Sequence, residues 1–178
     1  ANSIKELFKN VGMKLYDIEK IDVHGGSLRC FIKNSLNAKI TNRCKKILTN
    51  EKKKLNVHAF KSFNREIYKN AKIFKDKLML LNKKGCNIIG YGALARVSTI
   101  TNVAKIDSSL IKYIIDDSPL KQNRFSPGMN IKILPRKNNI NKNIDIVIVF
   151  AYEYFKDINK FFKKIKVQFF KPIPFSKL

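Results

Sequence analysis

Apolar residues recur at helical spacing through the middle of the chain, in one segment from about Ala38 to Lys54 and another from about Val57 to Lys84. The second segment carries a long apolar stripe, whose members are Phe60, Phe63, Ile67, Phe74, Leu78 and Leu81. Packing in a core explains this stripe more simply than ligand binding does. Gly85 follows the segment, at the place where a left-handed residue commonly ends a helix.

From Cys86 onward, short apolar runs alternate with helical segments. The pattern predicts strands at residues 87–91, 110–115, 131–134, 144–150 and 167–170, and helices at 93–103 and 154–164. The run 144–150 is apolar except for Asp145, which is typical of a parallel strand covered on both faces. This alternation predicts an α/β fold with a Rossmann-like, doubly wound, mostly parallel sheet.

The first 33 residues show a third pattern. Ser3 and Glu6 fit a capping box and predict a helix that begins at Ser3, with Gly12 placed where it would stop. Two alternating runs around Gly25 and Gly26 predict an antiparallel β-hairpin. Because a helix with a two-stranded hairpin cannot bury both faces unaided, it is not a domain by itself. We therefore divide the chain into residues 1–37, a helical connector at 38–84, and a Rossmann-like domain at 85–178.

The net charge of +24 suits an anionic ligand or partner. Nucleic-acid binding is one interpretation, but most of the basic residues are Lys, whereas bidentate reading of guanine requires Arg. The sequence also contains no recognised nucleic-acid-binding module. Lys, Asn, Ile and Phe are all abundant, as expected from an AT-rich coding sequence, and this explains the charge without any partner. We predict no specific nucleic-acid partner.

Cysteine usage and hydropathy bound the remaining classes. Cys30, Cys44 and Cys86 are widely spaced without a CxxC pair, so we predict no metal site. Free thiols suit a reducing cytosol, and no apolar signal segment is present at the N-terminus. The longest apolar run, Ile146 to Tyr152, is far below the ~20 residues that span a bilayer. We therefore expect a soluble, cytoplasmic protein that is not bound to a membrane.

A glycine-rich turn carries the candidate chemistry. Residues 90–95, GYGALA, fit G-x-G-x-x-A between a predicted strand and a predicted helix, where backbone N–H groups can meet a phosphate. Asp116 closes the second strand, where an acidic residue meets a ribose hydroxyl in dinucleotide folds. A polar loop follows at 116–128. A tight turn that binds nothing is the plain alternative. The predicted ligand contacts are Gly90, Tyr91, Gly92, Ala93, Arg96, Ser98, Thr99, Asp116, Lys121 and Arg124.

Several motifs in order and register resemble the C-terminal domain of SAM-dependent sugar C-methyltransferases. They are GYGALAR at 90–96, IIDDSPLKQNRFSPG at 114–128, DIVIVFAYEYFKDI at 145–158, FFKPIP at 169–174 and, upstream, HGGSLR at 24–29. The resemblance covers nearly the whole chain. The chain departs from the family pattern at Val97 and Asn123, where the family has glycine, and at Tyr152-Glu153, where it has Trp-Asn.

The resemblance implies an enzyme that methylates a carbon of a keto-deoxy sugar carried on a nucleoside diphosphate. This part would bind and position the nucleotide sugar, and residues 1–37 would be the tail of a SAM-binding methyltransferase domain. The methyl donor S-adenosylmethionine and the catalytic base would then belong to that missing N-terminal domain, so we expect no cofactor bound here. His24 either faces the substrate or is simply solvated. An NAD- or CoA-binding Rossmann module and a basic nucleic-acid-binding protein remain as alternatives.

Overall fold

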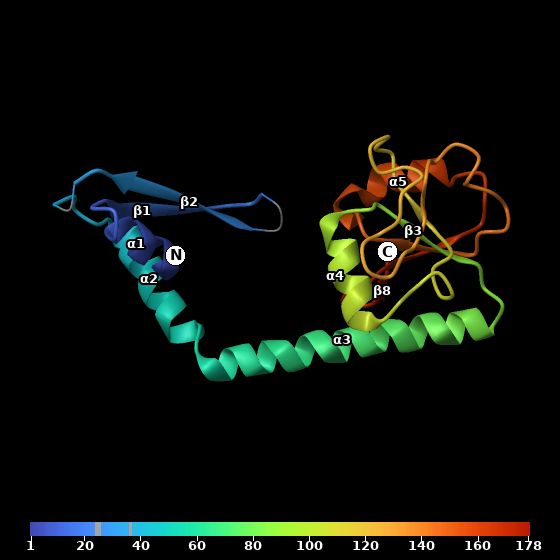
Figure 1. The fold of residues 1–178 in the computed structure, drawn as a ribbon, viewed down its shortest axis with the longest axis horizontal. Coiled ribbons are helices and arrows are strands. Elements are labelled where there is room, and N and C mark those ends of the chain that lie inside the picture. Colours follow the sequence, from blue (N-terminus) through green and yellow to red (C-terminus); the bar gives the residue numbers. More distant parts are fainter. Residues whose placement is uncertain (24–25, 36) are drawn as a thin grey trace. The chain divides into compact units, whose positions relative to one another are not determined.

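The computed structural model describes residues 1–23, 26–35 and 37–178, and these fall into two compact units, Ala1–Asn64 and Arg65–Leu178. Figure 1 labels many of their helices and strands. In chain order these elements are α1 (Asn2–Lys9), β1 (Lys14–Ile21), β2 (Ser27–Lys33), α2 (Asn42–Lys54), α3 (Val57–Lys83), β3 (Ile88–Tyr91), α4 (Ala95–Ala104), β4 (Ile114–Ile115), β5 (Ile133–Leu134), β6 (Ile146–Val149), a 3-10 turn η1 (Tyr152–Tyr154), α5 (Phe155–Phe161), β7 (Gln168–Lys171) and β8 (Ser176–Lys177). The predicted three-part division of the chain stays a prediction.

The first unit is an antiparallel β1–β2 hairpin with α1 and α2 beside it. Its small core contains Leu15 and Ile18 from β1 and Cys44 and Leu48 from α2. Thr41 caps α2, because its hydroxyl accepts a hydrogen bond from the Cys44 N–H at 3.1 Å. The predicted hairpin is thus confirmed in the described residues.

The predicted capping box at Ser3 was wrong. Helix α1 begins at Asn2, and its N-cap residue, Ala1, makes no side-chain capping hydrogen bond. Instead, the Glu51 carboxylate of α2 accepts hydrogen bonds from the Asn2 N–H at 2.6 Å and from the Ala1 ammonium at 2.7 Å. A carboxylate distant in sequence therefore serves the start of this helix, and the local Ser3–Glu6 pattern is not used.

The apolar stripe of α3 is only partly buried. Phe74 and Leu78 lie in the core of the second unit, as predicted, and Ala71 lies there with them. Phe60 and Phe63, at the other end of the stripe, keep 58% and 65% of their surface exposed, so core packing was the wrong interpretation there. Gly85 ends the helix as predicted, with φ 81°.

The second unit is built on a six-stranded sheet in the order β5-β4-β3-β6-β7-β8. Strands β3 to β7 pair in parallel, and β8 adds an antiparallel edge. Successive strand residues face opposite sides, so one apolar cluster packs against α3 and α4 and a second packs against α5. The predicted class, an α/β Rossmann-like fold with a doubly wound sheet, a long helical segment and an N-terminal hairpin, is confirmed.

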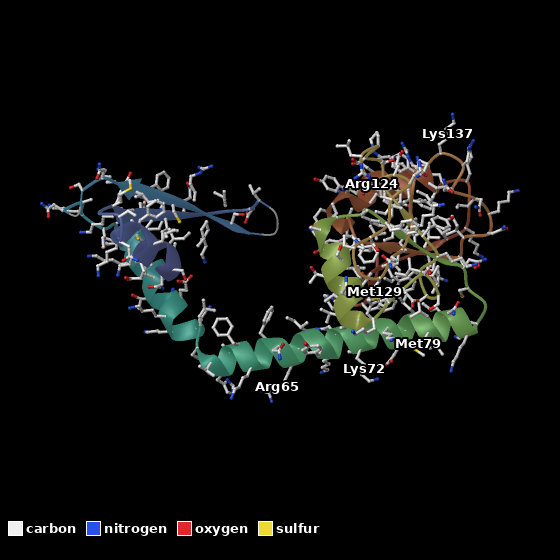
Figure 2. The ribbon with its side chains drawn as sticks, viewed as in Figure 1. Arg65, Lys72, Met79, Arg124, Met129 and Lys137 are labelled. Carbon is white, nitrogen blue, oxygen red and sulfur yellow. The ribbon has the colours of Figure 1, made fainter. Side chains whose placement is uncertain are left out.

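Some predicted strands are much shorter than the apolar runs that suggested them. Of the predicted strand 110–115, only Ile114 and Ile115 pair as β4, because the Asp107 carboxylate accepts the Ser109 N–H and hydroxyl and holds the preceding residues in a turn. The Asn/Lys-rich stretch 136–143 lies at the surface, and Lys137 points outward from it (Figure 2). Among the described residues, no helix is both long and apolar enough to cross a membrane.

Candidate functional site at the carboxyl ends of the strands

A crevice of about 350 Å³ opens where strands β3 and β6 end. Strand β3 lies between β4 and β6 in the sheet. The chain adds β4 and β5 on one side of β3 and later adds β6 and β7 on the other side, so the direction of the strand order reverses beside β3. Open α/β sheets bind their ligands outside such a switch point. The crevice is lined by Tyr91, Gly92, Leu94, Asp116, Asp117, Lys121, Ala151, Tyr154, Asp157, Ile158 and Phe161.

The two glycines of the turn allow close packing between neighbouring strands. A Cβ on Gly90 would lie 2.9 Å from the Ile114 side chain, and one on Gly92 would lie 2.6 Å from the Ala151 Cβ. Gly92 also has φ 90°, which L side chains rarely adopt, and its N–H donates to the Ile115 carbonyl at 2.7 Å. Packing alone therefore requires both glycines, whether or not a phosphate approaches the turn.

The Asp116 carboxylate joins the glycine turn to the following polar loop. It accepts hydrogen bonds from the Ala93 N–H at 2.6 Å and the Ser118 N–H at 2.9 Å, and Lys121 Nζ lies 3.4 Å from it. The turn at 90–93 and the loop at 116–128 consequently border the same crevice. Because two backbone N–H groups already occupy this carboxylate, Asp116 acts here as a positioning residue.

A second set of hydrogen-bonded polar side chains lies at the crevice. The Tyr91 hydroxyl donates to Asp117 at 2.7 Å, and Arg136 Nε donates to the other oxygen of Asp117 at 3.0 Å. The Arg136 guanidinium lies 3.6 Å from the centre of the Phe161 ring. Burial, followed by the hydrogen bond to Asp117, raises the pKa of Tyr91, which favours the protonated phenol that donates to Asp117.

A charged cluster lies beside the crevice at the start of α4. Arg96 Nη1 lies 2.6 Å from Glu153 Oε1. Arg96 and Lys171 both face the ring of Tyr152, at 5.0 and 4.7 Å from its centre. Burial alone would raise the pKa of Glu153, but a backbone hydrogen bond and the Arg96 guanidinium together lower it, which keeps this carboxylate charged at neutral pH.

Comparison with protein families assigns the chain to a family. The family model for the C-methyltransferase C-terminal domain matches residues 22–174. The chain belongs to this family. A comparison with curated proteins returned no match. The chain is therefore a C-methyltransferase C-terminal domain, which is a part of a transferase. The match confirms the family resemblance that the motifs indicated.

The structure brings together some of the contacts predicted for this C-methyltransferase domain. Tyr91, Gly92, Asp116 and Lys121 line the crevice. Gly90 is buried beneath Ile114 and Phe150, and the Ala93 N–H is bound to Asp116. Four of the other predicted contacts do not line the crevice: Arg96 pairs with Glu153, Ser98 and Thr99 lie farther along α4, and Arg124 is exposed in the loop (Figure 2). The prediction for His24 falls outside the described residues.

Sequence reasoning missed seven of the eleven described residues that line the crevice. Tyr154, Asp157, Ile158 and Phe161 come from η1 and α5, directly after the strongly apolar strand β6. The position of that strand beside the glycine-bearing strand was the signal that could have identified them, because parallel strands end at the same edge of a sheet. Asp117 was visible beside Asp116, but its partner Arg136 lies in an irregular loop with no such signal.

The methyltransferase domain accommodates its departures from the family pattern in different ways. Asn123 has φ 61°, a left-handed conformation that asparagine tolerates better than other non-glycine residues. Its N–H donates to the Ile133 carbonyl at 2.8 Å, so the turn is kept without the glycine. Val97 is buried against the core by α4. Glu153 alone among these departures places a new charge beside the crevice.

The loop 116–128 is also held at its far end. Asn102 Nδ2 donates to the Pro127 carbonyl at 2.9 Å and to the Ser98 carbonyl at 2.7 Å. Gly128 has φ 89° and packs so closely that a Cβ there would lie 2.0 Å from Asn102. The loop is therefore tied to α4 at its end and to the glycine turn at its start.

Proposed function

We propose that this domain binds a nucleoside-diphosphate keto-deoxy sugar and positions it for C-methylation. The observation that supports this most directly is the crevice at the switch point, bordered by both the glycine turn and the 116–128 loop. Its volume of about 350 Å³ lies within the range of small-molecule sites. Leu94, Ile158 and Phe161 offer apolar surface to rings, and Lys121 at the rim offers a positive charge to a phosphate.

In this proposal the chain contributes orientation. A base from the preceding SAM-binding methyltransferase domain removes the proton next to the sugar ketone, and the resulting enolate carbon takes up the methyl group. S-adenosylmethionine, bound to that domain, would supply this methyl group. Holding the nucleotide end of the substrate fixes the reacting carbon, and such positioning accounts for a large share of many enzymatic rate enhancements. Lys121 is the cation among the described residues that line the crevice, which also include the Tyr91 and Tyr154 hydroxyls and the carboxylates of Asp116, Asp117 and Asp157.

Asp116 occupies the position at which dinucleotide folds hold a ribose hydroxyl, and its carboxylate already accepts the N–H groups of Ala93 and Ser118. In this proposal S-adenosylmethionine would bind to the preceding methyltransferase domain, and this crevice would take the nucleotide sugar.

We further propose that residues 1–37 complete a preceding methyltransferase domain. Two-stranded ribbons are marginal alone, and β1 pairs with β2 in a two-stranded sheet. The match to the C-terminal domain family begins at residue 22, so it includes β2, and residues 1–21 precede it. Leu7 and Val11 beside the hairpin keep 63% and 65% of their surface exposed. An added domain that contacts this apolar surface would bury it.

Calorimetry on the full chain tests ligand binding. A thymidine- or uridine-diphosphate keto-deoxy sugar should bind, and Lys121→Met should weaken binding about three- to tenfold, as expected for one partly exposed charge contact. Lys163→Met, which removes an exposed charge elsewhere on the same unit, should leave affinity unchanged. No heat of binding at millimolar ligand in a folded sample would contradict the proposal.

The same experiment separates the alternatives. Thermal stabilisation by NAD or CoA, with none by the nucleotide sugar, would indicate a dinucleotide module. Tight, steeply salt-dependent binding of DNA or RNA would indicate a nucleic-acid partner. Weak binding at low salt would indicate neither, because any chain of charge +24 attracts polyanions.

A further inference from the structure

The ion pair between Arg96 and Glu153 lies where an anionic ligand would meet the start of α4. Arg96 belongs to the first turn of that helix, and Glu153 belongs to η1, which follows β6. Their side chains retain 36% and 40% of their surface exposed, so solvent and small ions reach both. Lys171 adds a further cation from β7 on the ring of Tyr152.

Two cations flank the glycine turn, and each is held by a carboxylate of this chain. Lys121 pairs with Asp116, and Arg96 pairs with Glu153. The two carboxylates differ in how firmly they are fixed. Asp116 is nearly buried and accepts two backbone N–H groups, so it cannot withdraw without disrupting the turn. Glu153 lies at the surface, where the Arg96 guanidinium contacts it.

We propose that Glu153 is a specificity-determining residue that competes with a ligand phosphate for Arg96. Its carboxylate neutralises the guanidinium, so a simple anion gains little there, while a ligand that also fills the crevice can displace the carboxylate. A chain of charge +24 would otherwise collect small phosphates at this position. The inference relies on the proposed function only for the phosphate-bearing character of the ligand.

Binding of inorganic pyrophosphate, with sulfate as a second probe whose charge is constant near pH 7, tests this competition. Glu153→Gln removes the charge and keeps the shape, and it should tighten pyrophosphate binding about three- to tenfold at low salt. Glu153→Asp keeps the charge, so its affinity for pyrophosphate should stay closer to that of the unaltered protein. Asp76→Asn, which neutralises an exposed carboxylate paired with Lys72 on α3, should change the affinity by less than about twofold.

A double-mutant cycle distinguishes this role from a structural one. If Glu153 acts through Arg96, Glu153→Gln should give no gain in a protein that already carries Arg96→Gln. The gain should also shrink as salt rises. A Glu153→Gln protein that is folded by circular dichroism and binds pyrophosphate no more tightly than the unaltered protein overturns the proposal. A gain in pyrophosphate affinity from Glu153→Gln that persists in the Arg96→Gln protein also overturns the proposal.

The outcome is independent of the nucleotide-sugar titration. Pyrophosphate carries no sugar or base, so it probes the Arg96 position without requiring the crevice to be filled. A gain from Glu153→Gln with no nucleotide-sugar binding would retain this inference and reject the proposed function. Nucleotide-sugar binding with no gain in pyrophosphate affinity from Glu153→Gln would reject this inference and retain the proposed function.

Discussion

Replacing Gly92 by alanine tests whether the glycine turn is maintained by packing. Alanine at φ 90° is strained, and such backbone strain costs about 1–3 kcal/mol. The new Cβ would also lie 2.6 Å from the Ala151 Cβ and 3.1 Å from the Ala151 nitrogen, and overpacking of this kind costs about 1–3 kcal/mol more. We expect the free energy of unfolding to fall by about 2–5 kcal/mol, a large fraction of the total stability of a small domain.

Gly85→Ala is the matched control. Gly85 has φ 81°, close to that of Gly92, but a Cβ there would meet nothing within 4 Å. It should therefore show the cost of strain alone, at the lower end of about 1–3 kcal/mol. Adding Ala151→Gly to Gly92→Ala should recover stability, because it removes the Cβ that the new methyl group meets.

Urea unfolding followed by circular dichroism measures all three variants on the full chain. If Gly92→Ala costs no more than Gly85→Ala, the close approach to Ala151 does not constrain this turn. If the Ala151→Gly change recovers nothing, the contact with that side chain is not the source of the loss.

Three further outcomes follow from the same contacts. Asp116→Ala leaves the Ala93 and Ser118 N–H groups without their carboxylate and should lower the free energy of unfolding by about 2–4 kcal/mol in urea titrations. Asn123→Ala should cost about 1 kcal/mol because of its φ of 61°, whereas Asn123→Gly should be nearly neutral, and equal losses would exclude the backbone explanation. The hydrogen bond from Arg43, followed by that from Thr41, lowers the pKa of Asp17 from 3.8 to about 2. A lowered folded-state pKa stabilises the fold above pH 4 and loses that effect as the pH falls towards 2, so Asp17→Asn should flatten acid unfolding across this window, and an unchanged pH profile would contradict it.

The fold was predictable because local patterns and the global arrangement agree in the second unit. Strongly apolar runs such as 144–150 indicated buried parallel strands, and Gly90 and Gly92 marked the turn that leaves β3. The meeting of Asp116 with this turn followed from the shared edge of parallel strands.

Two of the failures arise from contacts between residues distant in sequence, and a third arises from a local turn. Glu51 displaced the capping box at Ser3 because α2 packs beside α1, and no local pattern encodes that contact. Arg136 reaches Asp117 from an irregular loop. The strand lengths were overestimated because apolar residues such as Ile111 are buried by a turn and contribute no pairing to the sheet.

The anchoring of the 116–128 loop at both ends bears on the thermodynamics of recognition. Asp116 fixes its first residues and Asn102 its last, so the loop adopts its shape before any ligand arrives. Binding of a ligand in the crevice then causes little further loss of conformational entropy in this loop, so the ordering of the loop offsets less of the favourable binding free energy. Amide hydrogen exchange in the loop should therefore be slow already in the free protein and change little on saturation.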